Sequence, residues 1–244
     1  MSAPILKQAV AQAETVTPYR EPLVAFASAG DHLFTQIETI IGPHHLHPGE
    51  MLPEAKTVVA FFIPFGEEVV KANRNEREKV ARVWSIAYVE TNRLISEICE
   101  RVKQVLEAQG IKAVAERPTH NFNEKDLTAG WSHKSVAIVA GLGTFGVNRM
   151  LITPAGCAGR FGSMVISAEI PPTPRPGREF CRYYSEGQCL YCVNNCPTGA
   201  LKVDGLDKQT CYRRLLEVAG QFTDLGLCDV CSKCALGPCA TGPA

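Results

Sequence analysis

Cysteine crowds the end of this chain, and that crowding limits what the chain can fold into more than any other feature. Of the 11 cysteines in 244 residues, only Cys99 and Cys157 precede residue 181, which leaves nine. The first residues carry no signal-peptide pattern, so we predict a cytoplasmic protein, and persistent disulfides are rare in that reducing compartment. We therefore expect the late cysteines to bind metal rather than to be scattered free thiols or transient disulfides.

The stretch CLYCVNNCPTGA contains most of the C-x2-C-x2-C-x3-C-P run with which bacterial ferredoxins hold [4Fe–4S] clusters. Three cysteines stand at the required spacing: Cys189, Cys192 and Cys196. Glu186 occupies the position of the first cysteine of the run, and Cys181 lies further upstream. Because the thiolates only have to converge on the cluster, a longer first gap is acceptable, and Cys181 is the candidate for the missing ligand.

A second group of cysteines follows in the segment CDVCSKCALGPC, with Cys211 between the two groups. Its members are Cys228, Cys231, Cys234 and Cys239. Two [4Fe–4S] clusters, each held by four thiolates, would use all but one of the nine late cysteines. Two alternatives stay open: a pair of zinc sites, since C-x2-C pairs also bind Zn2+, and clusters that only stabilise the fold.

Several segments resemble the epoxyqueuosine reductase and reductive dehalogenase superfamily. CLYCVNNCPTGAL, LDKQTCYRRLLE and CSKCALGPC resemble its double-cluster module, and KSVAIVAGLGTFGVNRMLITPAG resembles its AGLGxxGxN segment. The similarity spans roughly residues 131–239, and the repeat-rich C-terminal extension of these enzymes has no counterpart here, so the chain resembles a short form.

The resemblance implies that the cysteines are divided between the clusters in a crossed pattern. One [4Fe–4S] cluster would be held by Cys181, Cys189, Cys192 and Cys239. The other would be held by Cys196, Cys211, Cys231 and Cys234. Cys228 is then left over, either as a spare thiol or as an alternative ligand.

The glycine segment is the expected cofactor-binding region. In the resembling enzymes it helps to form a pocket for cobalamin beside a cluster, which implies the lining residues Gly141, Gly143, Gly146 and Asn148. A structural turn, with the asparagine capping a neighbouring strand or loop, would explain the same residues. A Rossmann dinucleotide site is disfavoured, because no full helix follows and no acidic residue stands about 20 positions on.

Two residues are candidates for acid–base catalysis. Epoxyqueuosine reductases carry an acidic proton donor shortly before a proline, and here Ala115 occupies the aligned position with Glu116 one step further on. His133, ahead of the glycine segment, is the second candidate, with a surface or capping role as its alternative. Other histidines that could bind metal or transfer protons, or simply be solvated on loops, are His44, His45, His47 and His120.

Strand and helix patterns before the late cysteines predict an α/β fold, more narrowly the α+β type of flavin reductases and nitroreductases that the resemblance implies. We expect strands at residues 22–28, 57–65 and 111–116 and two strands within 151–170. We expect helices at residues 3–14, 31–41, 74–109 with one break, and 133–143. A proline-rich linker at 171–179 divides the chain into a cofactor- or substrate-binding domain, 1–172, and a two-cluster ferredoxin-like module, 173–244.

These features predict an iron–sulfur redox protein that relays electrons from an external ferredoxin- or flavodoxin-type donor to a centre in the first domain. One form is a cobalamin-dependent reductase of a small molecule, and the alternative is a non-enzymatic electron carrier for a partner enzyme. The formal net charge of zero gives no basis for binding nucleic acid. The longest apolar run, VVAFFIPF, is too short to span a membrane.

Overall fold

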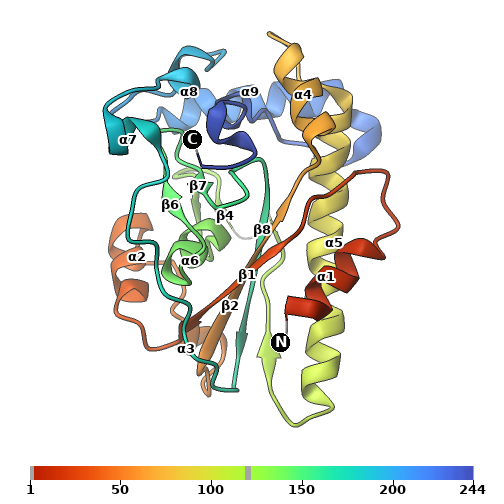
Figure 1. The fold of residues 1–244 in the computed structure, drawn as a ribbon, viewed down its shortest axis with the longest axis vertical. Helices are drawn as coiled ribbons and strands as arrows, with labels where there is room; N and C mark the ends of the chain where they lie inside the picture. The colour runs from red at the N-terminus through yellow and green to blue at the C-terminus, as the bar shows by residue number, and fades with distance from the viewer. Residues whose placement is uncertain (1–2, 119–121, 244) are drawn as a thin grey trace.

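A four-stranded antiparallel sheet forms the centre of the computed structural model, which describes residues 3–118 and 122–243 (Figure 1). Its strands, in spatial order, are β1 (Leu23–Ser28), β2 (Thr57–Pro64), β8 (Gly159–Ile166) and β3 (Ala113–Val114). The strands expected at 22–28, 57–65 and 111–116 are confirmed. His120 lies outside the described residues.

Helices cover both faces of this sheet (Figure 1). One face packs against α1 (Ala3–Ala11) and α5 (Arg82–Glu107), and the other against α2 (Leu33–Ile41) and α6 (His133–Val139). The strand β2 is buried along its whole length, and its alternate residues serve the two layers. Val58, Ala60 and Phe62 join the α2/α6 layer, whereas Val59, Phe61 and Ile63 join the α1/α5 layer. This is the period-two pattern of a strand covered on both faces.

The helix expected at residues 74–109 is two helices, α4 (Glu67–Asn75) and α5, separated by residues 76–81. The intervening segment begins with four consecutive charged residues, which offer no apolar stripe to continue the helix, and only Val80 and Ala81 at its end pack against the core. Within α5, Trp84, Tyr88, Ile95 and Ile98 recur at helical spacing and are buried, as expected for a core-facing stripe. The helix α6 begins where the Ser132 side chain accepts a hydrogen bond from the Ser135 backbone N–H.

Short elements connect these layers. They are α3 (Pro48–Met51), the hairpin of β4 (Phe122–Asn123) and β5 (Thr128–Ala129), and the ladder of β6 (Thr144–Phe145) with β7 (Leu151–Ile152). The two strands expected within 151–170 are β7 and β8. However, β7 pairs with β6, and only β8 enters the main sheet.

The cysteine-rich segment crosses one end of the sheet, at the top of Figure 1. Its elements are α7 (Arg182–Glu186), α8 (Tyr191–Asn194), α9 (Lys208–Gln221) and the 3-10 turns η1 (Thr223–Leu225), η2 (Lys233–Ala235) and η3 (Pro238–Ala240). Trp84 and Tyr88 of α5 share one hydrophobic cluster with Val218 and Val230 of this segment. The α/β class is therefore confirmed, while the division after residue 172 stays a prediction.

Two residues of η3 pair with the two residues that immediately precede β8. The backbone N–H groups of Cys157 and Ala158 donate to the carbonyl oxygens of Cys239 and Ala240, both at 3.0 Å. Arg20 joins the same region, because its guanidinium donates to the carbonyl oxygens of Phe65, Ala155 and Thr241. None of the described helices combines the length and apolar character needed to cross a lipid bilayer.

Candidate metal centre

Four cysteines from separate parts of the chain line one small cavity. They are Cys181, Cys189, Cys192 and Cys239. Cys181 is the N-cap of α7, Cys192 lies in α8, and Cys239 lies in η3. The structure thus brings the upstream cysteine and the last cysteine of the chain to the two cysteines of the ferredoxin-like run.

Cys189 has a backbone φ of 76°, in the left-handed region that side chains other than glycine rarely adopt. This conformation costs roughly 1–2 kcal/mol, and such strained residues concentrate at functional sites. Gly187, two residues earlier, also lies in the left-handed region and ends α7, which lets the chain turn back from Cys181 towards Cys189. The local backbone is therefore shaped to aim two thiols at the same cavity.

The other four cysteines that the resemblance implies as one ligand set, here called the second group, are Cys196, Cys211, Cys231 and Cys234, and their thiols interact with one another. Burial raises the pKa of the Cys234 thiol to about 12, and the neighbouring Cys231 and Cys211 thiols raise it further in the same direction. Burial likewise raises the pKa of Cys211, and the Cys231 and Cys196 thiols raise it further. Cys211 lies in the first turns of α9, where the Asp207 N-cap accepts from the Thr210 N–H. The fold therefore assembles a second set of thiols next to the first.

Both groups fit clusters better than single ions. Burial raises the pKa of Cys192 to about 11, so thiolates in these groups require a nearby positive centre. Within residues 3–118 and 122–243, no three His, Cys, Asp or Glu side chains converge closely enough to hold one metal ion. A tetrahedral zinc site needs all four sulfurs about 2.3 Å from one point, whereas a cubane spreads its ligands around a larger body.

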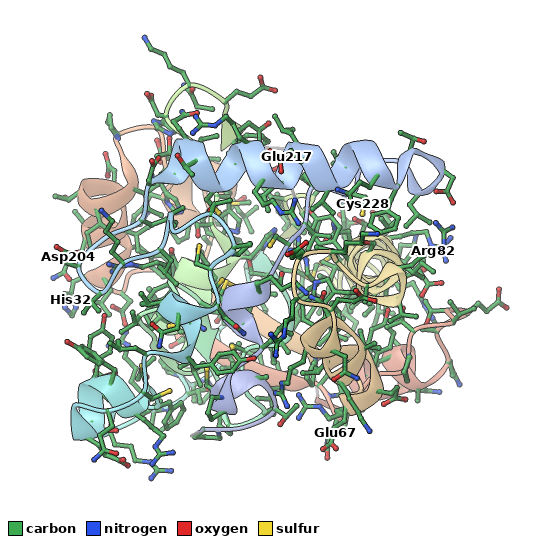
Figure 2. The ribbon with its side chains drawn as sticks, turned by 90° about the horizontal axis from the view of Figure 1, so that it is seen from above. His32, Glu67, Arg82, Asp204, Glu217 and Cys228 are labelled. Carbon is green, nitrogen blue, oxygen red and sulfur yellow. The ribbon has the colours of Figure 1, made fainter. Side chains whose placement is uncertain are left out.

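Cys228 contacts the helix α5 and does not line the cavity of the first group. Its side chain is fully buried in the hydrophobic cluster that contains Trp84, and its Sγ lies 3.9 Å from the Ser85 carbonyl oxygen. Figure 2 shows Cys228 beside the helix α5, seen end-on, and near Arg82. The thiol therefore packs against α5, which fits the spare-thiol interpretation.

Cys157 was not singled out from the sequence, yet it lies at the first group. It is 1% exposed, and its Sγ is 3.9 Å from the Sγ of Cys239. The two residues are 82 positions apart, so no spacing rule connects them. The backbone pairing of η3 with the residues just before β8 brings them together.

Lys233, between two cysteines of the second group, is a further residue that sequence analysis missed. It is 3% exposed, and its ammonium donates to the Asn73 carbonyl oxygen at 2.6 Å, to the Asn73 side chain and to the Glu76 carbonyl oxygen. The Asn73 amide in turn donates to the Cys231 carbonyl oxygen at 3.3 Å. These bonds satisfy the C-terminal carbonyls of α4 and fix the cysteine loop to that helix.

The glycine segment makes its close approaches to this chain's own backbone. A side chain at Gly143 would overlap the Ile152 carbonyl oxygen, and one at Gly141, whose φ is 86°, would lie 3.0 Å from the Pro174 carbonyl oxygen. A side chain at Gly146 would meet the Asn148 side chain at 2.7 Å. These contacts explain the glycines without a bound group, so their part in a cobalamin pocket stays a prediction.

Asn148, in contrast, reaches the first group of cysteines. It lines their cavity, and its Nδ2 donates to the Cys234 carbonyl oxygen at 3.3 Å. The same amide nitrogen lies 3.6 Å from the Cys157 Sγ and 3.9 Å from the Cys239 Sγ. Its Oδ1 accepts from the Met150 N–H, which holds the amide in this orientation.

The two candidate acid–base residues lie apart. Glu116 lines a cavity of about 980 Å3 between α5 and the segment after β3, together with charged residues such as Arg93, Arg101 and Arg117. His133 does not line this cavity. Its Nδ1 lies 2.8 Å from the Ser163 hydroxyl of β8, and its Nε2 is buried and has no hydrogen-bond partner in the structure.

The remaining described histidines make separate local contacts. His44 bonds to the Thr128 hydroxyl, and His47 caps α3. His45 accepts from the Ser132 N–H and stacks on Trp131, and burial lowers its pKa. These contacts are structural and do not form a shared ligand set.

His133 gives a pH dependence of stability. Burial, and secondarily the Arg160 charge, lower its pKa from 6.5 to about 4. A depressed pKa means that the unfolded chain binds the proton first, so stability is lost as pH falls below about 6.5. Between about pH 7.5 and pH 5.5 we expect this residue to remove roughly 1 kcal/mol from the free energy of unfolding. Urea unfolding of wild type and His133→Gln at both pH values measures it, and an equal loss in both proteins would contradict it.

Fold and site together define an α/β protein capped by a cysteine-rich module. Solved epoxyqueuosine reductases share this fold. The Bacillus subtilis enzyme with its catalytic loop swung out superposes with a TM-score of 0.61 at 21% identity, covering 99% of this chain and 67% of that one. A catabolic reductive dehalogenase gives a TM-score of 0.57 at 16% identity, covering 79% of this chain and 27% of that one.

Sequence comparison confirms the resemblance to epoxyqueuosine reductases. The Bacillus cereus enzyme is 28% identical over 177 residues, which cover 71% of this chain and 43% of that enzyme. The Staphylococcus aureus enzyme is 34% identical over 113 residues, covering 42% and 28%. The aligned stretches thus cover less than half the length of these curated relatives. No known protein-family profile matches it.

Proposed function

We propose that this chain is an iron–sulfur redox protein with two [4Fe–4S] clusters. Cys181, Cys189, Cys192 and Cys239 would hold the first cluster, and Cys196, Cys211, Cys231 and Cys234 the second. The observation that carries the proposal is the convergence of four cysteines, from three separate elements and a strained turn, on one cavity. A ferredoxin-like arrangement of the module follows from the shared use of the 189–196 run by both groups.

When bound, the clusters would supply one-electron transfer. The chain would contribute ligands, burial and charge, the protein's means of setting a cluster's potential. Near the second group, Lys134 donates to the Arg149 carbonyl oxygen at 3.0 Å, and its ammonium interacts favourably with Cys234 and Cys211. The buried ammonium of Lys233, bonded to the C-terminal end of α4, also interacts favourably with Cys231. Positive charges there would favour the reduced, more negative state of that cluster.

The cavity beside Glu116 is a candidate site for the small-molecule substrate of a reductase. Its volume of about 980 Å3 is in the range of small-molecule sites, but its lining includes none of the candidate cluster cysteines and no residue of the glycine segment, so it is distinct from the cobalamin pocket that the glycine segment implies. One structural neighbour is described as a B12-dependent reductive dehalogenase, which makes cobalamin the cofactor to test, with Glu116 as the candidate proton donor. The carrier that serves a partner enzyme remains the alternative.

The proposed partners are a ferredoxin- or flavodoxin-type donor in the cytoplasm and a small-molecule substrate. We predicted from net charge that nucleic acid is not a partner. One structural neighbour, with a TM-score of 0.59 at 20% identity, is an epoxyqueuosine reductase solved with a tRNA stem loop. This fold is therefore compatible with an RNA substrate, which the net charge of this chain argues against.

The test is metal analysis of protein purified without oxygen. We expect about eight irons and about eight acid-labile sulfides per chain, the content of two four-iron cubanes. Zinc without sulfide would contradict the proposal. Stoichiometric uptake of added cobalamin would support the reductase, whereas about eight irons with no uptake would favour the electron carrier.

A further inference from the structure

The thiol of Cys157 is held against Cys239 by backbone as well as by packing. The Cys157 N–H donates to the Cys239 carbonyl oxygen at 3.0 Å, while the two Sγ atoms are 3.9 Å apart. On the other side, Asn148 Nδ2 lies 3.6 Å from the Cys157 Sγ. A side chain at Gly156, whose φ is 85°, would overlap the Ala240 carbonyl oxygen, so the preceding turn also fits closely against η3.

We propose that Cys157 is a positioning residue that donates an S–H···S hydrogen bond to the Cys239 sulfur and thereby raises the reduction potential of the cluster that Cys239 helps to hold. This inference rests on the proposed function. It concerns a residue outside the eight assigned ligands and outside the cysteine-rich segment.

The Cys157 thiol has two acceptors within reach. Its Sγ is 3.7 Å from the Ala235 carbonyl oxygen and 3.9 Å from the Cys239 Sγ. When Cys239 is a metal-bound thiolate it carries negative charge, and hydrogen bonds to charged acceptors are the stronger ones. The proton is then directed to Cys239, with the Ala235 carbonyl as the alternative acceptor when Cys239 is neutral.

Burial makes this single bond effective. Cys157 is 1% exposed and Asn148 is 5% exposed, so water does not compete for the ligand sulfur from this side. A hydrogen bond is electrostatically stronger in such surroundings than in water. Hydrogen bonds to the sulfurs are among the factors that set cluster potentials, because they stabilise the extra negative charge of the reduced state. Removal of the bond should therefore make the potential more negative.

The test compares Cys157→Ala, Cys157→Ser and Cys228→Ala by redox titration followed by electron paramagnetic resonance, with iron counted in each sample. The first cluster is identified as the one whose signal disappears in Cys192→Ala. We expect Cys157→Ala to keep about eight irons and to shift the first potential to a more negative value, with the second unchanged. Cys157→Ser, which keeps a donor, should restore part of the shift. Cys228→Ala, an equally buried cysteine against α5, should shift neither potential.

Two outcomes would overturn the inference while leaving the proposed function intact. If Cys157→Ala and Cys157→Ser both titrate like wild type, the thiol only fills space. If Cys157→Ala loses about four irons, Cys157 is a ligand and not a positioning residue. A wild-type protein without iron and sulfide would instead refute the proposed function itself. Because serine nearly preserves the volume, the Cys157→Ser titration decides the question even if the alanine variant is unstable.

Discussion

Replacement of Cys192 with alanine is expected to remove about half of the iron and one of the two cluster signals. Cys192 lines the cavity shared by Cys181, Cys189 and Cys239. Loss of one thiolate leaves an iron with no protein ligand in a site that the remaining thiols cannot close. Cys234→Ala should remove the other signal, because Cys234 lies with Cys211 and Cys231. Iron and sulfide analysis of anaerobically purified variants measures both effects.

Cys228→Ala is the matched control for these two variants. It lies in the same segment and is fully buried, but its Sγ faces the Ser85 carbonyl oxygen of α5. We expect it to keep the full iron content and both signals, with a stability loss of only about 1 kcal/mol for the small cavity. Loss of a cluster in this variant would reassign Cys228 as a ligand and overturn the partition of the cysteines.

Local patterns were enough to predict much of this fold. The apolar run of β2 and the helical stripe of α5 are encoded by neighbouring residues, and both elements lie within the ranges expected for them. The two-residue strands β4, β5 and β6 were not predicted. Strands that short carry no periodicity, and tertiary pairing alone stabilises them.

In the candidate site too, residues with a local sequence pattern were predicted, and residues placed only by tertiary contacts were not. The ferredoxin-like run predicted Cys189, Cys192 and Cys196 as ligands, because metal ligands close in sequence have a characteristic spacing. Cys157 and Lys233 were missed, since their roles depend on contacts with Cys239 and Asn73 that only the folded chain creates. The glycine segment matched a cofactor motif, yet its contacts are with Ile152 and Pro174 of the chain itself.

Gly143→Ala is expected to destabilise the protein strongly. A methyl group at this position would overlap the Ile152 carbonyl oxygen, next to the β6–β7 ladder. The atoms that the methyl group would meet belong to the backbone of Ile152 and Thr153 and cannot move aside as a flexible side chain could. We therefore expect a loss of about 3 kcal/mol or more in the free energy of unfolding. Urea unfolding followed by circular dichroism measures this loss.

Gly205→Ala is the control for this effect, because an added methyl group there meets no atom within 4 Å, and its expected change is within about 0.5 kcal/mol. The pair of variants also separates the two hypotheses for the glycine segment. If Gly143 is glycine because β7 passes so closely, Gly143→Ala loses stability whether or not any cofactor is supplied. If it is glycine because a cofactor approaches, the variant unfolds like wild type and loses only cofactor uptake. The close approach of Ile152 favours the first outcome. In that case the glycine segment fixes the position of β7 and of the neighbouring Asn148, whose amide contacts Cys157 at the first group of cysteines.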